Sequence, residues 1–412
     1  MFIFKEQQLW DACTSGDYDL VKLLANDSSV SVNWIGPESG DTPLHRAARF
    51  GHVQVVEFLL RRPKVEVNAS NAGQATPFYI ACQNGHKEVA SLFLADPRIV
   101  VNRPNNNGAT PFYIGCQQGH KQVVLLLLTD KKIDVNIPHK EGGSPFYIAC
   151  QNGHKEVVSL LLADKRIDAN KPNNNGSTPF FIGCDKGHKE VVSLLLADPR
   201  VDVTKPNNNE ATPFFIACSR GHKEVVLLFL ADMRIDISKP NNNQCTPLWF
   251  ASQNGHLPVV RLLLASGREI DTKTKSIAGT APWNNTTAAE VARWSGSSGS
   301  WKDEKEENTA RRKEFCPLIV MLLDSYEQNP QQVRDQLRQQ LGIKGKRLSL
   351  SSFAWVFISS FSFGSCTNKS WSGVQWGTTW PVPAANILGG THSLSSKGAV
   401  DLFSNDCAVL RP

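Results

Sequence analysis

The sequence predicts a mainly α solenoid in which helix-turn-helix units stack and β-hairpins project. Three observations predict this fold. Six Thr-Pro or Ser-Pro pairs recur at a constant interval of 34 residues, starting at Thr76, Thr110, Ser144, Thr178, Thr212 and Thr246. Each pair opens a near-identical copy that holds two apolar runs at helical spacing, and several copies continue into an Asn-rich loop. A fixed period in this range indicates a stacked array, because no unit buries its apolar face without its neighbours.

The copy at 110–143 shows why each element is expected. Thr110 is suited to cap a helix with its hydroxyl, and Pro111 fits the first helical position, where a missing N–H costs nothing. Gly119 provides a left-handed stop, and the run from Val123 to Leu128 has the spacing of a second amphipathic helix. A short extended stretch, 133–136, should then lead into the loop, which favours a tight turn where it contains Asn-Gly.

This pattern resembles the ankyrin repeat. Thr42-Pro43-Leu44-His45, with Ala47-Ala48, Gly51-His52 and the apolar run from Val55 to Leu60, is similar to the family motif, and the resemblance covers roughly residues 6–325. It departs from the family in two ways. The period exceeds the usual one of about 33 residues, with the extra residue near Asp96. The histidine of the motif is also replaced in the later copies, where aromatic packing is expected instead of its hydrogen bonds, by Tyr79, Tyr113, Tyr147, Phe181, Phe215 and Trp249.

The array has recognisable ends. We expect an N-terminal capping repeat in 1–41, seven repeats in 42–280 and a degenerate C-terminal capping repeat in 281–343. Within the last, residues 287–293 should form a first helix, 295–314 a solvated insertion, 317–326 a second helix and 330–341 a final amphipathic helix. The Ser- and Trp-rich stretch 344–412 is expected to be a disordered tail, and a lipid or partner anchor is the alternative.

Composition and charge narrow the kinds of partner and the location that we expect for this chain. The formal net charge of +6 is spread along 412 residues, which does not favour nucleic acid as a partner. Phe353 to Phe363 is apolar but far shorter than the ~20 residues of a membrane span. The N-terminal segment lacks the pattern of a secretion signal. We therefore expect a monomeric, cytoplasmic protein, with Lys344, Lys346 and Arg347 as a candidate nuclear import signal.

No catalytic, cofactor or metal site is expected. Cysteine and histidine recur four residues apart, as in Cys82 and His86, a pairing that could suggest zinc. The glycine between them should end the helix, so the two side chains need not share a face. The cysteines are expected to be reduced and buried in place of the family's alanine, and the histidines to brace the turn. The known hydrolase and phosphate-loop motifs are not found.

The resemblance implies that a protein partner docks on the concave face, which is built from loop tips and the exposed side of each first helix. Carried over by position, the candidate first-helix residues are Arg49, Phe50, Gln83, Asn84, Gln117, Gln118, Gln151, Asn152, Asp185, Lys186, Ser219 and Arg220, followed by Gln253 and Asn254. The candidate tip residues are Asn106, Asn107, Asn174 and Asn175, followed by Asn208, Asn209, Asn242 and Asn243. The plainer alternative is that these positions are simply solvated. The tip at 139–141, where His-Lys-Glu replaces Asn-Asn-Asn, is expected to be a solvated turn.

The expected function is a non-catalytic protein-interaction scaffold. Two alternatives stay open: an adaptor that targets substrates to a modifying enzyme complex, and a repeat spacer with no specific ligand.

Overall fold

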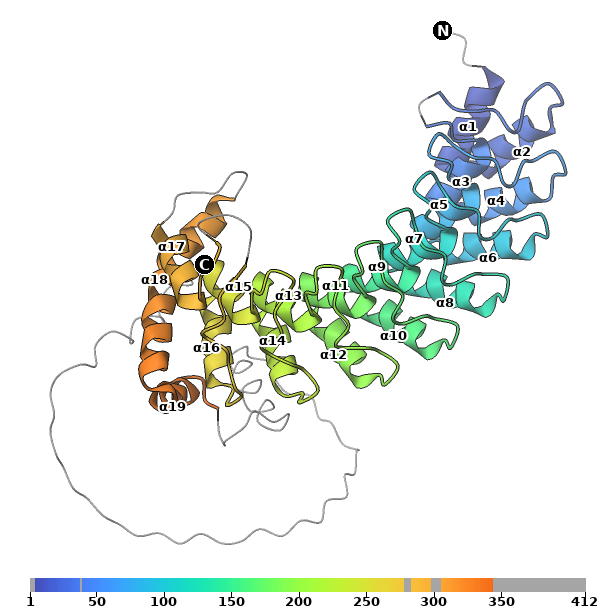
Figure 1. The fold of residues 1–412 in the computed structure, drawn as a ribbon. Helices are drawn as coiled ribbons and strands as arrows, with labels where there is room; N and C mark the ends of the chain where they lie inside the picture. The colour runs from blue at the N-terminus through green and yellow to red at the C-terminus, as the bar shows by residue number, and fades with distance from the viewer. Residues whose placement is uncertain (1–3, 38, 278–282, 298–304, 344–412) are drawn as a thin grey trace, which may run out of the picture. The chain divides into compact units, whose positions relative to one another are not determined.

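The computed structural model describes residues 4–37, 39–277, 283–297 and 305–343. Within these ranges the secondary structure is helical, and successive helix pairs stack in chain order (Figure 1). The first helices of the pairs are α1 (Lys5–Ser15), α3 (Pro43–Phe50), α5 (Pro77–Gln83), α7 (Pro111–Gln118), α9 (Pro145–Gln151), α11 (Pro179–Lys186), α13 (Pro213–Arg220) and α15 (Pro247–Gln253). The second helices are α2 (Tyr18–Asn26), α4 (Val53–Leu60), α6 (Lys87–Ala95), α8 (Lys121–Thr129), α10 (Lys155–Ala163), α12 (Lys189–Ala197), α14 (Lys223–Leu230) and α16 (Leu257–Ala265).

The predicted helix boundaries are confirmed in the copy at 110–143. The Thr110 hydroxyl accepts a hydrogen bond from the Tyr113 backbone N–H at 3.1 Å, and Pro111 occupies the first turn. Gly119 ends α7 with φ 74°. The same arrangement of cap and proline begins every first helix from α3 to α15.

The core runs through the array as one hydrophobic cluster that extends from Leu9 to Leu337. Phe112 and Cys116 of α7 and Leu127 of α8 are fully buried in it. Each first helix packs on the first helix of the next pair, and each second helix on the next second helix. Each pair therefore buries its apolar face against its neighbours, which is why the array predicted from the 34-residue interval forms.

Histidines link each pair to the one before it. The Nε2 of His154 lies 2.8 Å from the Gln117 carbonyl oxygen at the end of the preceding first helix, and six further histidines make the equivalent contact. The same ring packs over a glycine, because a Cβ added to Gly119 would lie 2.5 Å from His154 Nδ1. The expectation that these histidines brace the turn is therefore confirmed.

The extra residue of the 34-residue period lies in a turn that connects repeats. The Arg98 guanidinium contacts Asp96 Oδ2 at 2.6 Å and donates to the Leu60 carbonyl oxygen at 2.5 Å. Leu60 ends the second helix of the preceding pair, so the arginine satisfies a carbonyl that the helix leaves unpaired. Arg166, Arg200 and Arg234 make the same type of contact in later repeats.

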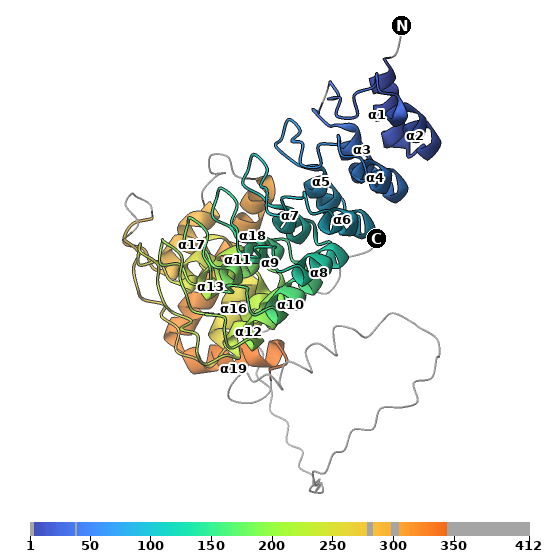
Figure 2. The same cartoon turned by 90° about the vertical axis from the view of Figure 1, so that its right-hand side faces the viewer.

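The projecting loops are turns, because the described residues contain no β-strand. In the loop before α7, the Asn105 side-chain oxygen accepts the backbone N–H groups of Asn107 and Ala109, which leaves few donors for a strand ladder. One backbone bond, from Asn106 to the Gly73 carbonyl oxygen, joins this loop to the preceding one. Figure 2 shows such loops following one another along the array. The extended stretch expected at 133–136 is likewise interrupted by a turn.

The C-terminal end differs from the expectation in one respect. The helices α17 (Ala288–Ser297) and α19 (Pro330–Gln340) form where they were predicted, but α17 ends inside the segment 295–314 that was expected to be a solvated loop, and α18 (Glu306–Gln328) begins inside it. Its buried positions are three or four residues apart, at Thr309, Arg312, Cys316, Ile319, Leu323 and Tyr326. The helix packs on α17 and α15, and apart from the buried Arg312 the charged residues Glu306, Glu307, Lys313 and Glu314 are exposed.

The expected tail, 344–412, and the basic cluster at 344–347 lie outside the described residues. In the part of the chain that the structure does describe, no helix is both long enough and apolar enough to cross a membrane.

Candidate functional site

The predicted partner-binding residues lie on one surface, which we call the first-helix face: the last turns of the first helices together with the tips of the loops that precede them. Its exposed members are Phe50, Asn84, Gln118, Asn152, Lys186, Arg220, Asn106, Asn107, Asn174 and Asn175. Its half-buried members are Arg49, Gln83, Gln117, Gln151, Asp185 and Ser219. Gln253 is buried beside α18, so the prediction that it is exposed was wrong.

Some amides on this face are already bonded to the protein. Asn106 Nδ2 donates to the Ala72 carbonyl oxygen at 3.2 Å, and Asn174 Nδ2 to that of Lys140 at 3.1 Å. Asn152 and Asn84 likewise donate to backbone carbonyl oxygens. These side chains position the loops and the helix ends, so they are poor choices as the main contacts of a partner.

Other amides on the face are uncommitted. Six side chains make no hydrogen bond to another described residue. They are the glutamines of α5, α7 and α9 and two asparagines of the loop tips: Gln83, Gln117, Gln118, Gln151, Asn107 and Asn175. A glutamine or asparagine amide offers two donors and one acceptor without a charge. A row of such groups spans the consecutive pairs α5/α6, α7/α8 and α9/α10.

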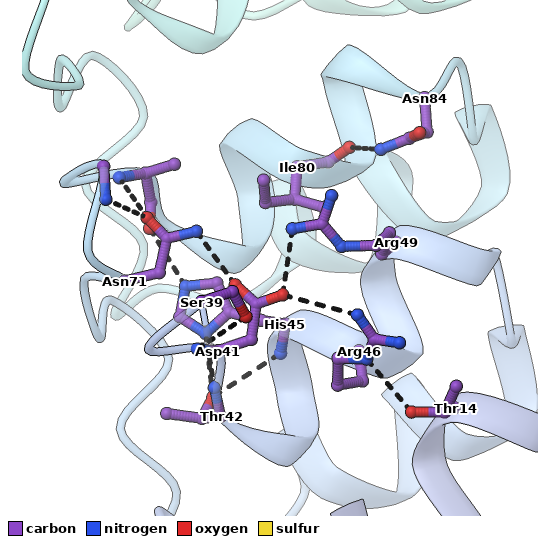
Figure 3. Close-up of polar contacts among 12 residues, drawn as sticks. Thr14, Ser39, Asp41, Thr42, His45, Arg46, Arg49, Asn71, Ile80 and Asn84 are labelled. Carbon is purple, nitrogen blue, oxygen red and sulfur yellow. Dashed lines mark hydrogen bonds and ion pairs between the residues drawn. The ribbon is translucent and has the colours of Figure 1, made fainter. Parts of the chain in front are cut away.

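A buried ion cluster lies at the N-terminal end of the face (Figure 3). Asp41 Oδ2 lies 2.9 Å from Arg49 Nη2 and 3.7 Å from Arg46 Nη1, and Asn71 Nδ2 donates to Asp41 Oδ1 at 2.9 Å. Burial alone would raise the Asp41 pKa, but the bonds from Asn71 and Arg49 outweigh it and the pKa is lowered. Arg49 is therefore a paired charge, and Arg46, whose Nε donates to Thr14 Oγ1 at 3.0 Å, joins the cluster to α1.

Phe50 belongs to an aromatic group beside this cluster. The Arg46 guanidinium carbon lies 4.2 Å from the ring centre of Trp10 and 4.9 Å from that of Phe50. Phe50 itself is 46% exposed. An aromatic ring stiffened by a cation on one side and open to solvent on the other is suited to contact a protein partner.

The charges in the later half of the face also pair. Asp185 lies 3.2 Å from Lys186 Nζ and 2.8 Å from Arg220 Nε. One carboxylate against two cations leaves one net positive charge on this part of the face.

A polar pocket of about 280 Å³ opens between the first helices and the loops in the first half of the array. It is lined by Tyr79, Tyr113 and Tyr147, one repeat apart, together with Gln117, Gln151, His139 and Glu141. The Tyr79 hydroxyl accepts a hydrogen bond from Asn105 at 3.0 Å, and the Tyr147 hydroxyl accepts one from Asn173 at 3.1 Å. Burial raises the pKa of both tyrosines to about 12, so they stay protonated near neutral pH.

Sequence profiles of known families match most of the helix pairs. One described as ankyrin repeats (3 copies) matches residues 63–139, 131–207 and 200–274, and one described as ankyrin repeats (many copies) matches residues 9–60. Together these matches cover more than half of the chain. The chain belongs to the ankyrin repeat family. No curated protein matches its sequence.

Within this ankyrin array, His45 keeps the histidine of the family motif. Its Nδ1 lies 3.1 Å from the Thr42 backbone N–H donor, and its Nε2 lies 2.9 Å from the Ala75 carbonyl oxygen. The expectation that aromatic packing alone replaces this histidine was incomplete. Tyr79 and Tyr147 keep a polar contact to the next loop, and Trp249 Nε1 donates to the Thr286 carbonyl oxygen at 3.0 Å.

The repeated cysteines and histidines of the ankyrin units have separate roles. Cys82 is fully buried, and burial raises the pKa of its thiol. His86 directs its Nε2 to the Arg49 carbonyl oxygen at 2.9 Å. Among the described residues, no group of three or more His, Cys, Asp or Glu side chains has the proximity of a metal site.

The pocket was not predicted from the sequence. The tyrosines were expected to be packing residues and 139–141 a solvated turn, whereas the structure places His139 and Glu141 in the pocket lining. A signal was present: His139 is the single exception at a loop position that holds asparagine in the neighbouring ankyrin units, at Asn71, Asn105, Asn173, Asn207 and Asn241.

Proposed function

We propose that this ankyrin array is a non-catalytic scaffold that binds a protein partner through its first-helix face, as a monomer in the cytoplasm. One observation carries the proposal: the row of uncommitted amides on α5, α7 and α9. The adjacent Asn84 and Asn152 donate to backbone carbonyl oxygens, whereas the side-chain amides of Gln83, Gln117 and Gln151 make no hydrogen bond to another described residue. Family membership supports a protein as the ligand, because ankyrin repeats generally act as interaction modules.

Affinity on such a face is spread over several repeats. Each glutamine contributes a neutral hydrogen bond worth about 0.5–1.5 kcal/mol once a partner has excluded water. Phe50 contributes an aromatic contact at the N-terminal end of the face. A partner that spans the face thus gains from shape and from a series of modest polar contacts.

The test is affinity capture from a lysate of the source cells with three baits. The first is the wild-type chain. The second carries Gln83→Arg, Gln117→Arg and Gln151→Arg on the first-helix face. The third is a matched control with Ser91→Arg, Gln122→Arg and Ser159→Arg, because these three residues are exposed on the second helices α6, α8 and α10. All three baits are first shown to melt at similar temperatures by circular dichroism.

We expect specific proteins to be captured by the wild-type bait and by the control bait but not by the bait with the three arginines on the first-helix face. Equal capture by all three baits would place the binding elsewhere and contradict the proposal. Retention of the same modifying-enzyme subunits by all three baits would favour the adaptor function. If the wild-type bait captures no specific protein, the result would favour a repeat spacer without a specific ligand.

A further inference from the structure

One loop of the array differs from the others in a way that frees a buried hydroxyl. At the first position of the other loops an asparagine accepts two backbone N–H groups, and Asn105 and Asn173 also donate to the hydroxyls of Tyr79 and Tyr147. His139 stands at this position in the loop before α9, where the equivalent tyrosine is Tyr113. Its ring stacks on Tyr113, with ring centres 5.2 Å apart and an interplanar angle of 19°.

Of the three tyrosines that line the pocket, Tyr113 is therefore the one whose hydroxyl accepts no hydrogen bond from a loop asparagine. Its side chain is 2% exposed, and its hydroxyl makes no hydrogen bond to any other described residue. Tyr113 is nevertheless one of the residues that line the pocket. A phenol held this way has both its proton and its lone pairs free for a group that enters the pocket.

The same loop carries a second difference from its neighbours. Gly143 occupies the position of Ala109 and Ser177 in the adjacent repeats. A Cβ added to Gly143 would lie 3.0 Å from Tyr147 Cδ1 and 3.4 Å from His139 Cε1. Gly143 therefore lies close to Tyr147 and beside His139, and both of these residues line the pocket.

The third change in this loop sets the charge of the pocket. Glu141 replaces the tip asparagine and is the one carboxylate among the lining residues. Its Oε2 lies 3.5 Å from His139 Nε2, and its side chain is 87% exposed, so it remains able to meet an incoming group. Lys140 is exposed on the same tip, but it does not line the pocket. The lining holds no lysine or arginine.

We propose that this pocket receives a basic side chain, lysine or arginine, from the protein partner, with Glu141 as its counter-charge and the Tyr113 hydroxyl as a hydrogen-bond acceptor. This inference rests on the proposed function, because it places one anchor of the partner on the first-helix face. The pocket volume of about 280 Å³ equals the share of roughly nine water molecules, which is enough for one long side chain. An acidic side chain would face Glu141 with no cation in the lining to offset the repulsion.

Tyrosine NMR provides the test, since the full chain has only five tyrosines. Tyr79, Tyr113 and Tyr147 line the pocket, whereas Tyr18 and Tyr326 lie elsewhere and serve as internal references. The ring-labelled chain is titrated with acetyl-Gly-Arg-Gly-amide, with its lysine counterpart, and with the citrulline and glutamate counterparts, at millimolar concentrations. Glu141→Gln removes the charge at an exposed position, and Tyr113→Phe reproduces the phenylalanine that Phe181 and Phe215 place at this position.

We expect the arginine or the lysine peptide to shift the Tyr113 and Tyr147 signals and to leave the two references unchanged. Glu141→Gln should weaken this binding about two- to fivefold, as expected for a solvent-exposed charge pair. Citrulline shifts equal to the arginine shifts, preferential binding of the glutamate peptide, or no shift with either basic peptide would overturn the inference. A negative result here together with face-dependent capture from lysate would reject the pocket and leave the proposed function standing.

Discussion

Arg220 Nε lies 2.8 Å from Asp185 Oδ1, across the boundary between two successive helix pairs. Both residues were predicted from the sequence to be charged contacts for a partner. Their pairing means that each charge is already satisfied within the array. Arg220 is 58% exposed at its side chain, so water and salt weaken the pair.

Substitution of Arg220 by alanine should therefore have a small effect on stability. We expect the free energy of unfolding to fall by at most about 1 kcal/mol, because exposed ion pairs contribute little. Urea denaturation in low salt and in 1 M NaCl measures this, and the difference between wild type and variant should shrink in high salt. A loss of several kcal/mol would mean that the pair is shielded from solvent.

Removal of the Asp41 carboxylate should be far more costly. The Asp41→Ala variant leaves Arg46 and Arg49 without their shared partner in a largely buried site, for which a loss of about 3 kcal/mol is typical. The loss should be local: hydrogen exchange in α1 and α2 should accelerate while α9 and α11 stay protected. Asp27→Ala, at an exposed ion pair with Lys5, is the control. Uniform acceleration along the array would contradict this localisation.

Two glycines of one helix pair should respond in opposite directions to alanine. Gly115→Ala adds a Cβ at ordinary contact distances of 3.6 Å and should stabilise the array by about 0.5–1 kcal/mol, since Ala81 and Ala149 hold this position in the adjacent repeats. Gly119→Ala should destabilise it by about 2 kcal/mol or more, because φ is 74° and the Cβ would meet His154. The melting temperatures of the two variants, measured side by side, test this prediction. Equal changes in melting temperature would contradict the close packing of His154 over Gly119.

The melting temperature should fall on mild acidification. Burial lowers the pKa of His256 to about 4, against 6.5 when unfolded, and burial also lowers that of His45. Between these values the unfolded state binds the extra proton, so protonation favours unfolding. The stabilisation is complete above pH 6.5 and is lost as the pH falls toward 4. In His256→Gln the melting temperature should be lower at pH 6.5 and should vary less with pH over this interval. If it depends on pH as strongly as in the wild type, His256 is not a source of the pH dependence.

The sequence predicted the array and its helix boundaries because both depend on residues close together in the chain. Thr110, Pro111 and Gly119 act on the helix to which they belong. It did not reveal the start of α18, because the many charges between 302 and 314 conceal the buried stripe that begins at Thr309.

The pocket could not be predicted from the sequence for a different reason. The relation between His139 and Tyr113 joins a loop to the first helix of the preceding repeat, so its meaning appears only when repeats are stacked. In the neighbouring repeats the equivalent positions are joined by a hydrogen bond across the same 26 residues. Uncommitted and bonded amides also cannot be told apart in the sequence: Asn106 donates to a backbone carbonyl oxygen, whereas the side chain of the adjacent Asn107 makes no hydrogen bond to another described residue.

A protein partner that contacts the first-helix face should protect the backbone of that face from exchange with solvent. The most direct measurement is hydrogen–deuterium exchange of the full chain, free and bound to a protein recovered by capture. In the complex we expect slower exchange in the last turns of α5, α7 and α9 and in the loops that precede them, with no change in α6, α8 and α10. Protection confined to the second helices would contradict it.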